Sequence, residues 1–188
     1  EVENVSIDTH GRYAYGKQPL IARWNLGRLA ETLLPLINVD MNRANQLAAD
    51  TVNAFADRYV ARWLDGMRAK LGLVSSEDDD LDLANGFLIA LKGQSADYTL
   101  AFRWLSLAAQ GDDDALRRLL EDPSAYDLWA DRWRARLSRE SVGAKARAQA
   151  MNRVNPIYIP RNHKVEEVLV SAVENQTLEP FKALSEVL

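Results

Sequence analysis

The first clear signal along this chain is an apolar residue at every third or fourth position between Met41 and Met67. The stripe consists of Met41, Ala44, Ala48, Val52, Phe55, Tyr59, Trp63 and Met67. This spacing places all of these side chains on one face of an α-helix. Asp40 is suited to cap the N-terminus of the helix, and Gly72 is suited to end it in the left-handed region. The pattern therefore predicts helical structure over residues 41–71.

The same period recurs through most of the remaining chain. A helix is predicted from Gln18, where Pro19 suits the first turn, to about Ile37. Ser75 and Ser76 precede a helix that is expected to span the acidic run and to end near Leu91. Further helices are predicted at 96–110, 112–120, 126–137, 144–153, 165–173 and from residue 180 onward.

One segment opposes helix formation. Residues 155–160 hold two prolines and three bulky side chains, so we expect an extended conformation there. No stretch alternates between apolar and polar residues over a useful length, and no internal repeat is found, so no sheet is predicted. The predicted fold class is all-α, an orthogonal or bundle-like array of about seven to nine helices in a single helical region, residues 1–188.

Composition excludes several classes of protein. Of the 188 residues, 47% are hydrophobic, which is enough for a core, and 27% are charged. No apolar run approaches the roughly 20 residues that span a bilayer, and the N-terminus is acidic and polar, unlike a secretory signal. The chain has no cysteine, which excludes disulfides and cysteine-based metal sites within it. We therefore expect a soluble, cytoplasmic protein.

The net charge of −4 conceals an uneven distribution. Residues 132–164 contain nine basic residues and one acid, Glu140. Such a basic stretch is typical of a docking surface or an anion site, and equally of charge complementarity within a larger protein.

Two acidic runs are candidates for metal sites. The denser run is Glu77 to Asp80 with Asp82, and the other is Asp112 to Asp114. A calcium loop needs ligands at alternating positions and a glycine at its sharp turn, whereas these acids are contiguous. Acids in the first turn of a helix also stabilise its dipole. Both runs are therefore interpreted as solvated helix starts, and no metal ligand is predicted.

The candidates for catalysis and cofactor binding are few. His10 and His163 are the only histidines, neither accompanies a nucleophile and an acid, and His163 is expected to begin a helix. Gly27 stands alone, and neither a Walker motif nor a dinucleotide-binding motif occurs. Residues 155–158 form a short NPxY sequence that carries little information by itself. No catalytic, cofactor-binding or metal-binding residue is predicted.

A nucleic-acid interface is one alternative from local chemistry, because aromatic stacking combined with arginine is a recurrent device for single strands. Trp129 and Trp133 lie among four arginines, Arg132, Arg134, Arg136 and Arg139. The tryptophans fall on the apolar stripe of their helix, whereas the arginines fall largely on other faces. This pattern favours a buried helix with a solvated basic side over a nucleic-acid interface.

Three longer motifs carry a resemblance. The first is Gly11-Arg12-Tyr13-Ala14-Tyr15-Gly16-Lys17-Gln18-Pro19, followed by Trp24-Asn25-Leu26 and Arg28-Leu29-Ala30. The second is Ala96-Asp97-Tyr98-Thr99 with Phe102-Arg103. The third is Met151-Asn152-Arg153-Val154-Asn155-Pro156, followed by Tyr158, Arg161 and Asn162. Together, and in this order, they resemble the selenoprotein O family from about residue 8 to residue 188.

The resemblance implies a protein-kinase-like fold and the transfer of AMP from ATP to hydroxyl groups of proteins, with Mg or Mn. Uridylylation from UTP is also attributed to bacterial members. In the family, the glycine-rich loop, the nucleotide lysine and the metal-binding Asn and Asp precede the first motif, and nothing here matches them. We therefore expect this chain to be the C-terminal helical part of a larger enzyme, without catalytic residues of its own.

The expected partners follow from this interpretation. They are the missing N-terminal kinase-like lobe, the protein substrates of the full-length enzyme, and further copies of the chain, through exposed apolar surface. The alternative is a stand-alone helical module that binds a protein or a nucleic acid without catalysis.

Overall fold

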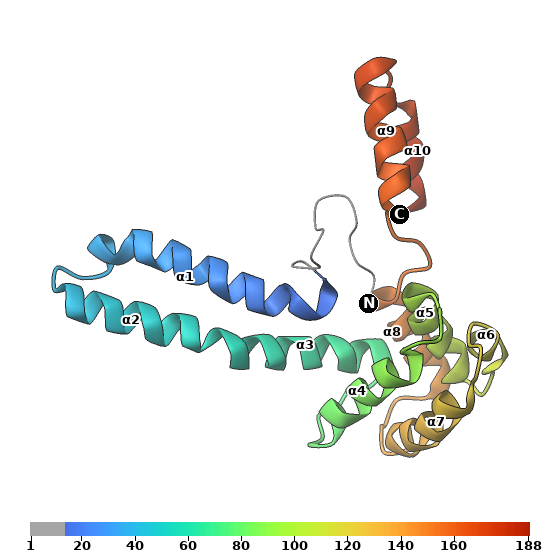
Figure 1. Cartoon of the computed structure of the whole chain (residues 1–188). Coiled ribbons are helices and arrows are strands. Elements are labelled where there is room, and N and C mark those ends of the chain that lie inside the picture. Colours follow the sequence, from blue (N-terminus) through green and yellow to red (C-terminus); the bar gives the residue numbers. More distant parts are fainter. Residues whose placement is uncertain (1–13) are drawn as a thin grey trace. The chain divides into compact units, whose positions relative to one another are not determined.

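The computed structural model describes residues 14–188, and these residues form helices without any strand (Figure 1). Their elements, in chain order, are the 3₁₀ turn η1 (Tyr15–Lys17) and the helices α1 (Gln18–Ile37), α2 (Met41–Asn53), α3 (Phe55–Leu71), α4 (Asp80–Leu91), α5 (Tyr98–Ala108), α6 (Asp114–Arg117), α7 (Ser124–Leu137), α8 (Ala144–Val154), α9 (Asn162–Glu174) and α10 (Glu179–Val187). Helix α6 has only four residues, and the other nine are longer. The predicted all-α class is confirmed.

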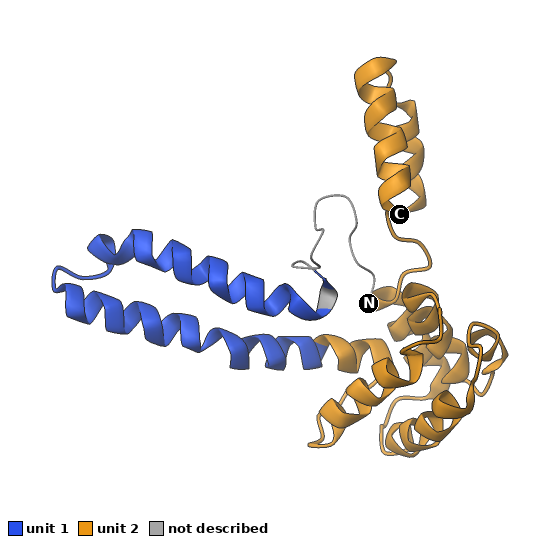
Figure 2. Cartoon of the chain, viewed as in Figure 1, with its two compact units in different colours: residues 1–65 blue, residues 66–188 orange. Residues whose placement is uncertain are grey.

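The chain divides into two compact units, residues 1–65 and residues 66–188 (Figure 2). The boundary falls within α3, between Asp65 and Gly66. In the first unit α1 packs along α2, and Arg23 Nη2 donates a hydrogen bond to Asn53 Oδ1 at 2.8 Å. This unit buries little, because no residue of α1 and only Ala44 of α2 is fully shielded from solvent.

The second unit holds the larger core, in which α7 packs on α4, and α5 packs on α6 and α8. The apolar stripe predicted for α7 is buried: Tyr126, Trp129, Ala130, Trp133 and Leu137. The two indoles also bind the backbone of other segments. Trp129 Nε1 donates to the carbonyl of Leu83 (2.8 Å), and Trp133 Nε1 donates to the carbonyl of Leu71 (2.9 Å). Because a buried indole N–H needs a partner, these bonds fix α7 against α4 and the end of α3.

Both predicted helix signals around residues 41–71 are confirmed. The Asp40 side chain accepts from the backbone N–H groups of Asn42 and Arg43, and Gly72 has a φ of +77°. The helical path is divided into α2 and α3 at Ala54, which retains α-region dihedral angles (φ −67°, ψ −9°). The predicted stripe therefore continues across two helices instead of one.

The helix predicted over the acidic run begins later than expected, at Asp80 instead of directly after Ser76. Hydrogen bonds hold the intervening residues outside the helix. Glu140 accepts from the backbone N–H groups of Val74 and Ser75, and Asp80 accepts from that of Glu77. These amides are satisfied by carboxylates, so the segment needs no helical pairing.

Gly72 provides a test of this packing, because an added Cβ would lie 2.7 Å from Met151 Sδ and 2.8 Å from Arg147 Cγ. Gly93 has a similar φ, +78°, but an added Cβ there meets nothing within 4 Å. We expect Gly93→Ala to cost about 1 kcal/mol from backbone strain alone. Gly72→Ala should cost a further 1–3 kcal/mol or so from overpacking. Urea unfolding of both variants measures the difference, and equal losses would contradict the steric argument.

Candidate functional site

The second unit contains a buried ion cluster centred on Arg136, which is 3% exposed. Its Nε donates to Asp80 Oδ1 (2.8 Å), and its Nη1 donates to Glu140 Oε1 (2.8 Å). Nη2 donates to the carbonyl of Ser75 (2.9 Å) and to its hydroxyl (3.2 Å). We call Arg136 and its neighbours Arg68, Ser75, Glu77, Asp80 and Glu140 the Arg136 cluster.

The two buried carboxylates of the cluster have further donors. The Asp80 side chain is fully buried, and its Oδ2 accepts from Arg68 Nε (2.7 Å) and from the Glu77 backbone N–H (2.9 Å). Glu140 is 3% exposed at its side chain and accepts from the hydroxyl (2.8 Å) and the backbone N–H (3.1 Å) of Ser75. Glu77, at the rim of the cluster, accepts from Arg139 Nη2 at 2.7 Å.

The electrostatics of the cluster favour the charged forms of Asp80, Arg136 and Glu140. Burial alone would raise the pKa of Asp80, but the hydrogen bonds from Arg136, from the Glu77 N–H and from Arg68 outweigh it, and the pKa is lowered. The pKa of Glu140 is lowered for the same reason, since bonds from Ser75 and Arg136 exceed the effect of burial. Burial would lower the pKa of Arg136, but its two carboxylate partners raise it. Each charge is thus neutralised within the protein.

A second group of polar contacts joins α3, α5 and the segment after α8. Asn155 is fully buried, and its Nδ2 donates to the carbonyl of Lys70 (2.9 Å). Lys70 Nζ donates back to Asn155 Oδ1 (3.3 Å), and Arg103 Nη1 donates to the carbonyls of Asn152 and Asn155 (both 3.0 Å). We call Lys70, Asp97, Arg103, Asn152, Asn155 and Arg161 the Asn155 junction.

Asp97 and Arg161 complete the junction. Asp97 caps α5 by accepting from the Leu100 N–H (3.0 Å). It also accepts from Nη2 of Arg161 (2.5 Å), the residue that directly precedes α9. Burial would raise the pKa of Asp97, yet these two bonds lower it. The second and third sequence motifs therefore meet in space, because Asp97 and Arg103 belong to one and Asn155 and Arg161 belong to the other.

The surroundings of Lys70, another member of the junction, disfavour its charge. Burial lowers its pKa, and its Nζ lies 5.2 Å from the centroid of the Phe102 ring. The ring face and the carbonyl of Val154 (3.4 Å) stabilise the ammonium in place of water. These contacts fix Lys70 within the fold, and its donors point at the protein's own oxygens.

The interpretation of the acidic runs as solvated helix starts is wrong for two of their members. Asp80 lies in the buried Arg136 cluster, and Asp113 accepts from the Tyr126 hydroxyl and from Arg134. Burial, followed by the contact with Asp113, raises the pKa of Tyr126 beyond its usual range. The neighbouring Asp78, Asp79, Asp112 and Asp114 are exposed, as predicted. Among residues 14–188 no group of acids and histidines is arranged to hold a metal ion.

The interpretation of the basic side of α7 as solvated is likewise wrong for Arg136. Seven of the nine basic residues of 132–164 bind acceptors within the chain: Arg132, Arg134, Arg136, Arg139, Arg147, Arg161 and Lys164. Of the two explanations offered by the sequence, internal charge complementarity accounts for most of this stretch. A nucleic-acid interface would instead present these groups to phosphates.

The other candidates from the sequence are the two histidines, the first motif and the NPxY sequence. His163 is the second residue of α9, as predicted, and is exposed. His10 and the first three residues of the first motif, Gly11 to Tyr13, lie outside the described residues. Residues 155–160 are free of helix, as predicted, and the NPxY sequence starts with the buried Asn155, which a peptide signal would have to expose.

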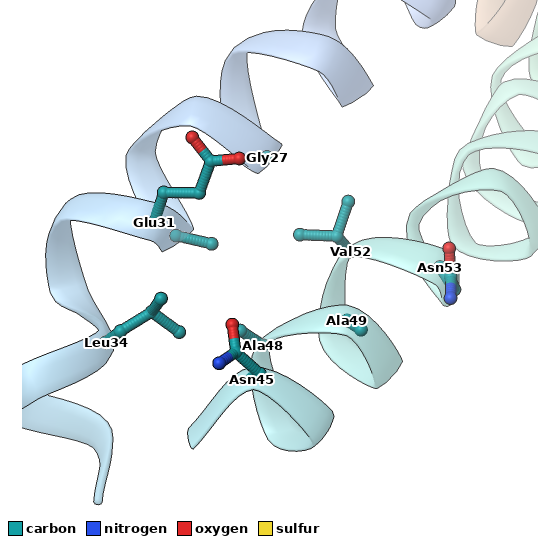
Figure 3. A pocket seen from close by; sticks show the side chains of 9 residues that line it. Gly27, Glu31, Leu34, Asn45, Ala48, Ala49, Val52 and Asn53 are labelled. Atoms are coloured by element: carbon teal, nitrogen blue, oxygen red, sulfur yellow. The ribbon is translucent and has the colours of Figure 1, made fainter. Parts of the chain in front are cut away.

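A hollow with a volume of about 300 Å³ lies between α1 and α2 in the first unit (Figure 3). Its lining residues are Gly27, Ala30, Glu31, Leu34, Asn45, Ala48, Ala49, Val52 and Asn53. Glu31 is the single charged residue of this lining, and it pairs with Arg28 on the same helix. The hollow therefore lacks the cations that would hold the phosphates of a nucleotide.

Sequence reasoning missed the Arg136 cluster and the Asn155 junction. The sequence held a signal for the Arg136 cluster. Arg136 follows Trp129 by seven residues and Trp133 by three, and Asp80 precedes Leu83 by three residues and Phe87 by seven. Both charges thus occupy buried stripe positions, and opposite charges at such positions suggest a pair. No comparable signal links Lys70 with Asn155, which are 85 residues apart.

Comparison with known proteins places this arrangement in a family. The family model described as "Protein adenylyltransferase SelO" matches residues 4–188. The chain is 49% identical to "Protein nucleotidyltransferase YdiU" of Rhizobium etli over 186 residues, and 49% identical to the YdiU of Rhodopseudomonas palustris strain HaA2 over 185 residues. It is 46% identical to the YdiU of Agrobacterium fabrum over 179 residues.

These alignments cover 95–97% of this chain but only 37–38% of each relative. The chain is therefore a helical segment that is homologous to part of the protein nucleotidyltransferases. It belongs to the SelO family, as the three motifs indicated, and it spans little more than a third of the length of the curated relatives it matches.

No helix within residues 14–188 is long and apolar enough to cross a membrane.

The Arg136 cluster can be tested by removing one partner. Arg136→Met leaves Asp80 and Glu140 buried without their main cation, so we expect a loss of about 3–5 kcal/mol in the free energy of unfolding. Arg132→Met is the matched control on the same helix, because its pair with Asp82 is exposed and contributes about 0–1 kcal/mol. Urea denaturation measures both values. A loss below about 1 kcal/mol for Arg136→Met would contradict the argument.

The lowered pKa values predict loss of stability in acid. The folded pKa values of Asp80 and Glu140 lie below their ordinary values of 3.8 and 4.5. The contribution of these two carboxylates to the free energy of unfolding is therefore complete at a pH above the ordinary values. It is lost as the pH falls through the lowered folded values. We expect the free energy of unfolding to be flat from about pH 7 to 5.5 and to fall steadily below about pH 4.5. In Glu140→Gln the fall should be shallower, and an identical slope would exclude Glu140 as a source.

Proposed function

We propose that this chain is a supporting helical region of a protein adenylyltransferase, which transfers AMP from ATP to hydroxyl groups of proteins with a bound Mg or Mn ion. The observation that carries the proposal is the match of the SelO family model to residues 4–188. In this proposal the nucleotide, the metal and the reacting groups are bound by the rest of the longer polypeptide, which corresponds to the part of each relative outside the aligned region.

The contacts within the described residues support a structural role for this region. The chemically capable side chains of the Arg136 cluster and the Asn155 junction are buried or paired with one another. A nucleotide site needs cations and amide donors that are aimed at an open cavity. Here the corresponding donors bind the protein's own carboxylates and carbonyls.

The Asn155 junction is the element through which this support would act. Arg103 and Asn155 bind backbone carbonyls, and a carbonyl contact fixes the path of a chain more than it fixes a side chain. The junction thereby sets the positions of α5, α8 and the segment leading to α9 relative to one another. Loss of one donor would loosen three segments at once.

The proposal is tested by comparing the 188-residue chain with the full-length polypeptide that contains it. With labelled ATP and Mg, we expect the full-length protein to incorporate AMP into itself or into a protein substrate. The 188-residue chain should incorporate none and should show no heat of ATP binding in calorimetry. Metal-dependent binding of ATP by the 188-residue chain would overturn the assignment of a supporting role.

A single variant separates support from catalysis. Asn155→Ala in the full-length protein should lower the melting temperature by several degrees, since a buried hydrogen-bonding side chain is lost and Lys70 loses a partner. The AMP-transfer rate per folded molecule and the KM for ATP should stay within about twofold of wild type. A fall of a hundredfold in kcat at full folding would instead place Asn155 in the catalytic machinery.

A further inference from the structure

Helix α1 carries a second apolar face besides the one that faces α2. The α2-facing residues Gly27, Ala30 and Leu34 line the hollow of Figure 3. A separate row on α1 consists of Ala22, Leu26, Leu29, Leu33 and Leu36. The four leucines of this row are 40%, 53%, 39% and 83% exposed. We call these five residues the α1 seam.

The spacing within the α1 seam specifies what kind of surface fits on it. The steps from Ala22 to Leu36 are four, three, four and three, which is the seven-residue repeat of the a and d positions in packed helices. A repeat of 3.5 residues keeps the row facing a partner helix that runs lengthwise, crossing at about 20°. The seam extends over roughly 21 Å at 1.5 Å per residue. It is therefore suited to an α-helix instead of a strand or a loop.

The residues that flank the seam indicate the chemistry of that helix. On one side lie the uncharged Asn25 and Thr32, and on the other lie Ala30 and Ile37. The one charged flanking residue, Arg23, donates to Asn53 of α2. Because charged flanking positions normally select a charged partner, their absence favours a helix with an apolar face.

We propose that the α1 seam binds an amphipathic α-helix from the portion of the longer polypeptide that lies outside these 188 residues. This rests on the proposed function, in which the chain is one region of a larger nucleotidyltransferase. Almost two thirds of each relative's length lies outside the aligned region, so a full-length homologue has ample further chain to supply such a helix. A tethered helix is present at a high effective concentration, whereas a second copy must be recruited from solution.

The test measures the accessibility of the seam with thiol labelling, since the 188 residues contain no cysteine. Leu29→Cys and Leu36→Cys place one thiol on the seam, and Val39→Cys, at a fully exposed apolar position of the same unit, is the matched control. Each variant is made in the 188-residue chain and in the full-length polypeptide. Maleimide labelling is followed at the engineered site by mass spectrometry, after circular dichroism has confirmed the helical content.

We expect both seam thiols to react at least about tenfold more slowly in the full-length polypeptide than in the 188-residue chain. The Val39→Cys thiol should react at the same rate in both. Equal rates for the seam thiols would overturn the proposal. Protection in the full-length protein that disappears on dilution would also overturn it, because a second copy would then be the occupant. AMP transfer is measured in parallel, so that protection without transfer contradicts the proposed function and leaves the seam assignment standing.

Discussion

The second unit depends on the burial of one guanidinium group. Arg136 reaches the core from the last turn of α7, where removal from water is unfavourable by several kcal/mol per ion. Its donors meet two carboxylates and a carbonyl, and each carboxylate has donors of its own. A cluster satisfied in this way tolerates few alternative arrangements, since a shift of any segment would strand a buried charge. We therefore expect the cluster to favour one arrangement of these segments over the alternatives.

The cluster also explains why the segment between α3 and α4 is irregular. Glu140 and Asp80 accept from the backbone amides of residues 74, 75 and 77, which removes the need for helical hydrogen bonds. The Asn155 junction works in the same manner, because Asn155 and Arg103 bind backbone carbonyls at Lys70 of α3 and after α8. Side-chain-to-backbone contacts thus fix the connections, while apolar contacts between helices form the core.

The helices were predictable because their signals are local. These signals are the spacing of the apolar residues, the N-cap residue Asp40 and the helix-ending Gly72. Each depends on residues within one or two turns of the chain, and each is confirmed. The start of α4 was not predictable, because Glu140, which holds the preceding residues out of the helix, lies 65 residues away from Ser75. The pairing of Lys70 with Asn155 is hidden for the same reason. The motifs could be recognised from the sequence. The sequence did not show that the second and third motifs meet in space.

The basic stretch shows how charge along a chain differs from charge on a surface. Nine cations in 33 residues would create a strong positive field if all of them faced solvent. Seven bind internal acceptors, and their carboxylate partners come largely from acidic runs elsewhere in the chain, so the two local excesses cancel within a few ångströms. At distances beyond a Debye length such pairs exert little field on a phosphate or a protein. The paired charges of this stretch therefore act mainly by fixing the packing and the backbone positions of the segments that they join.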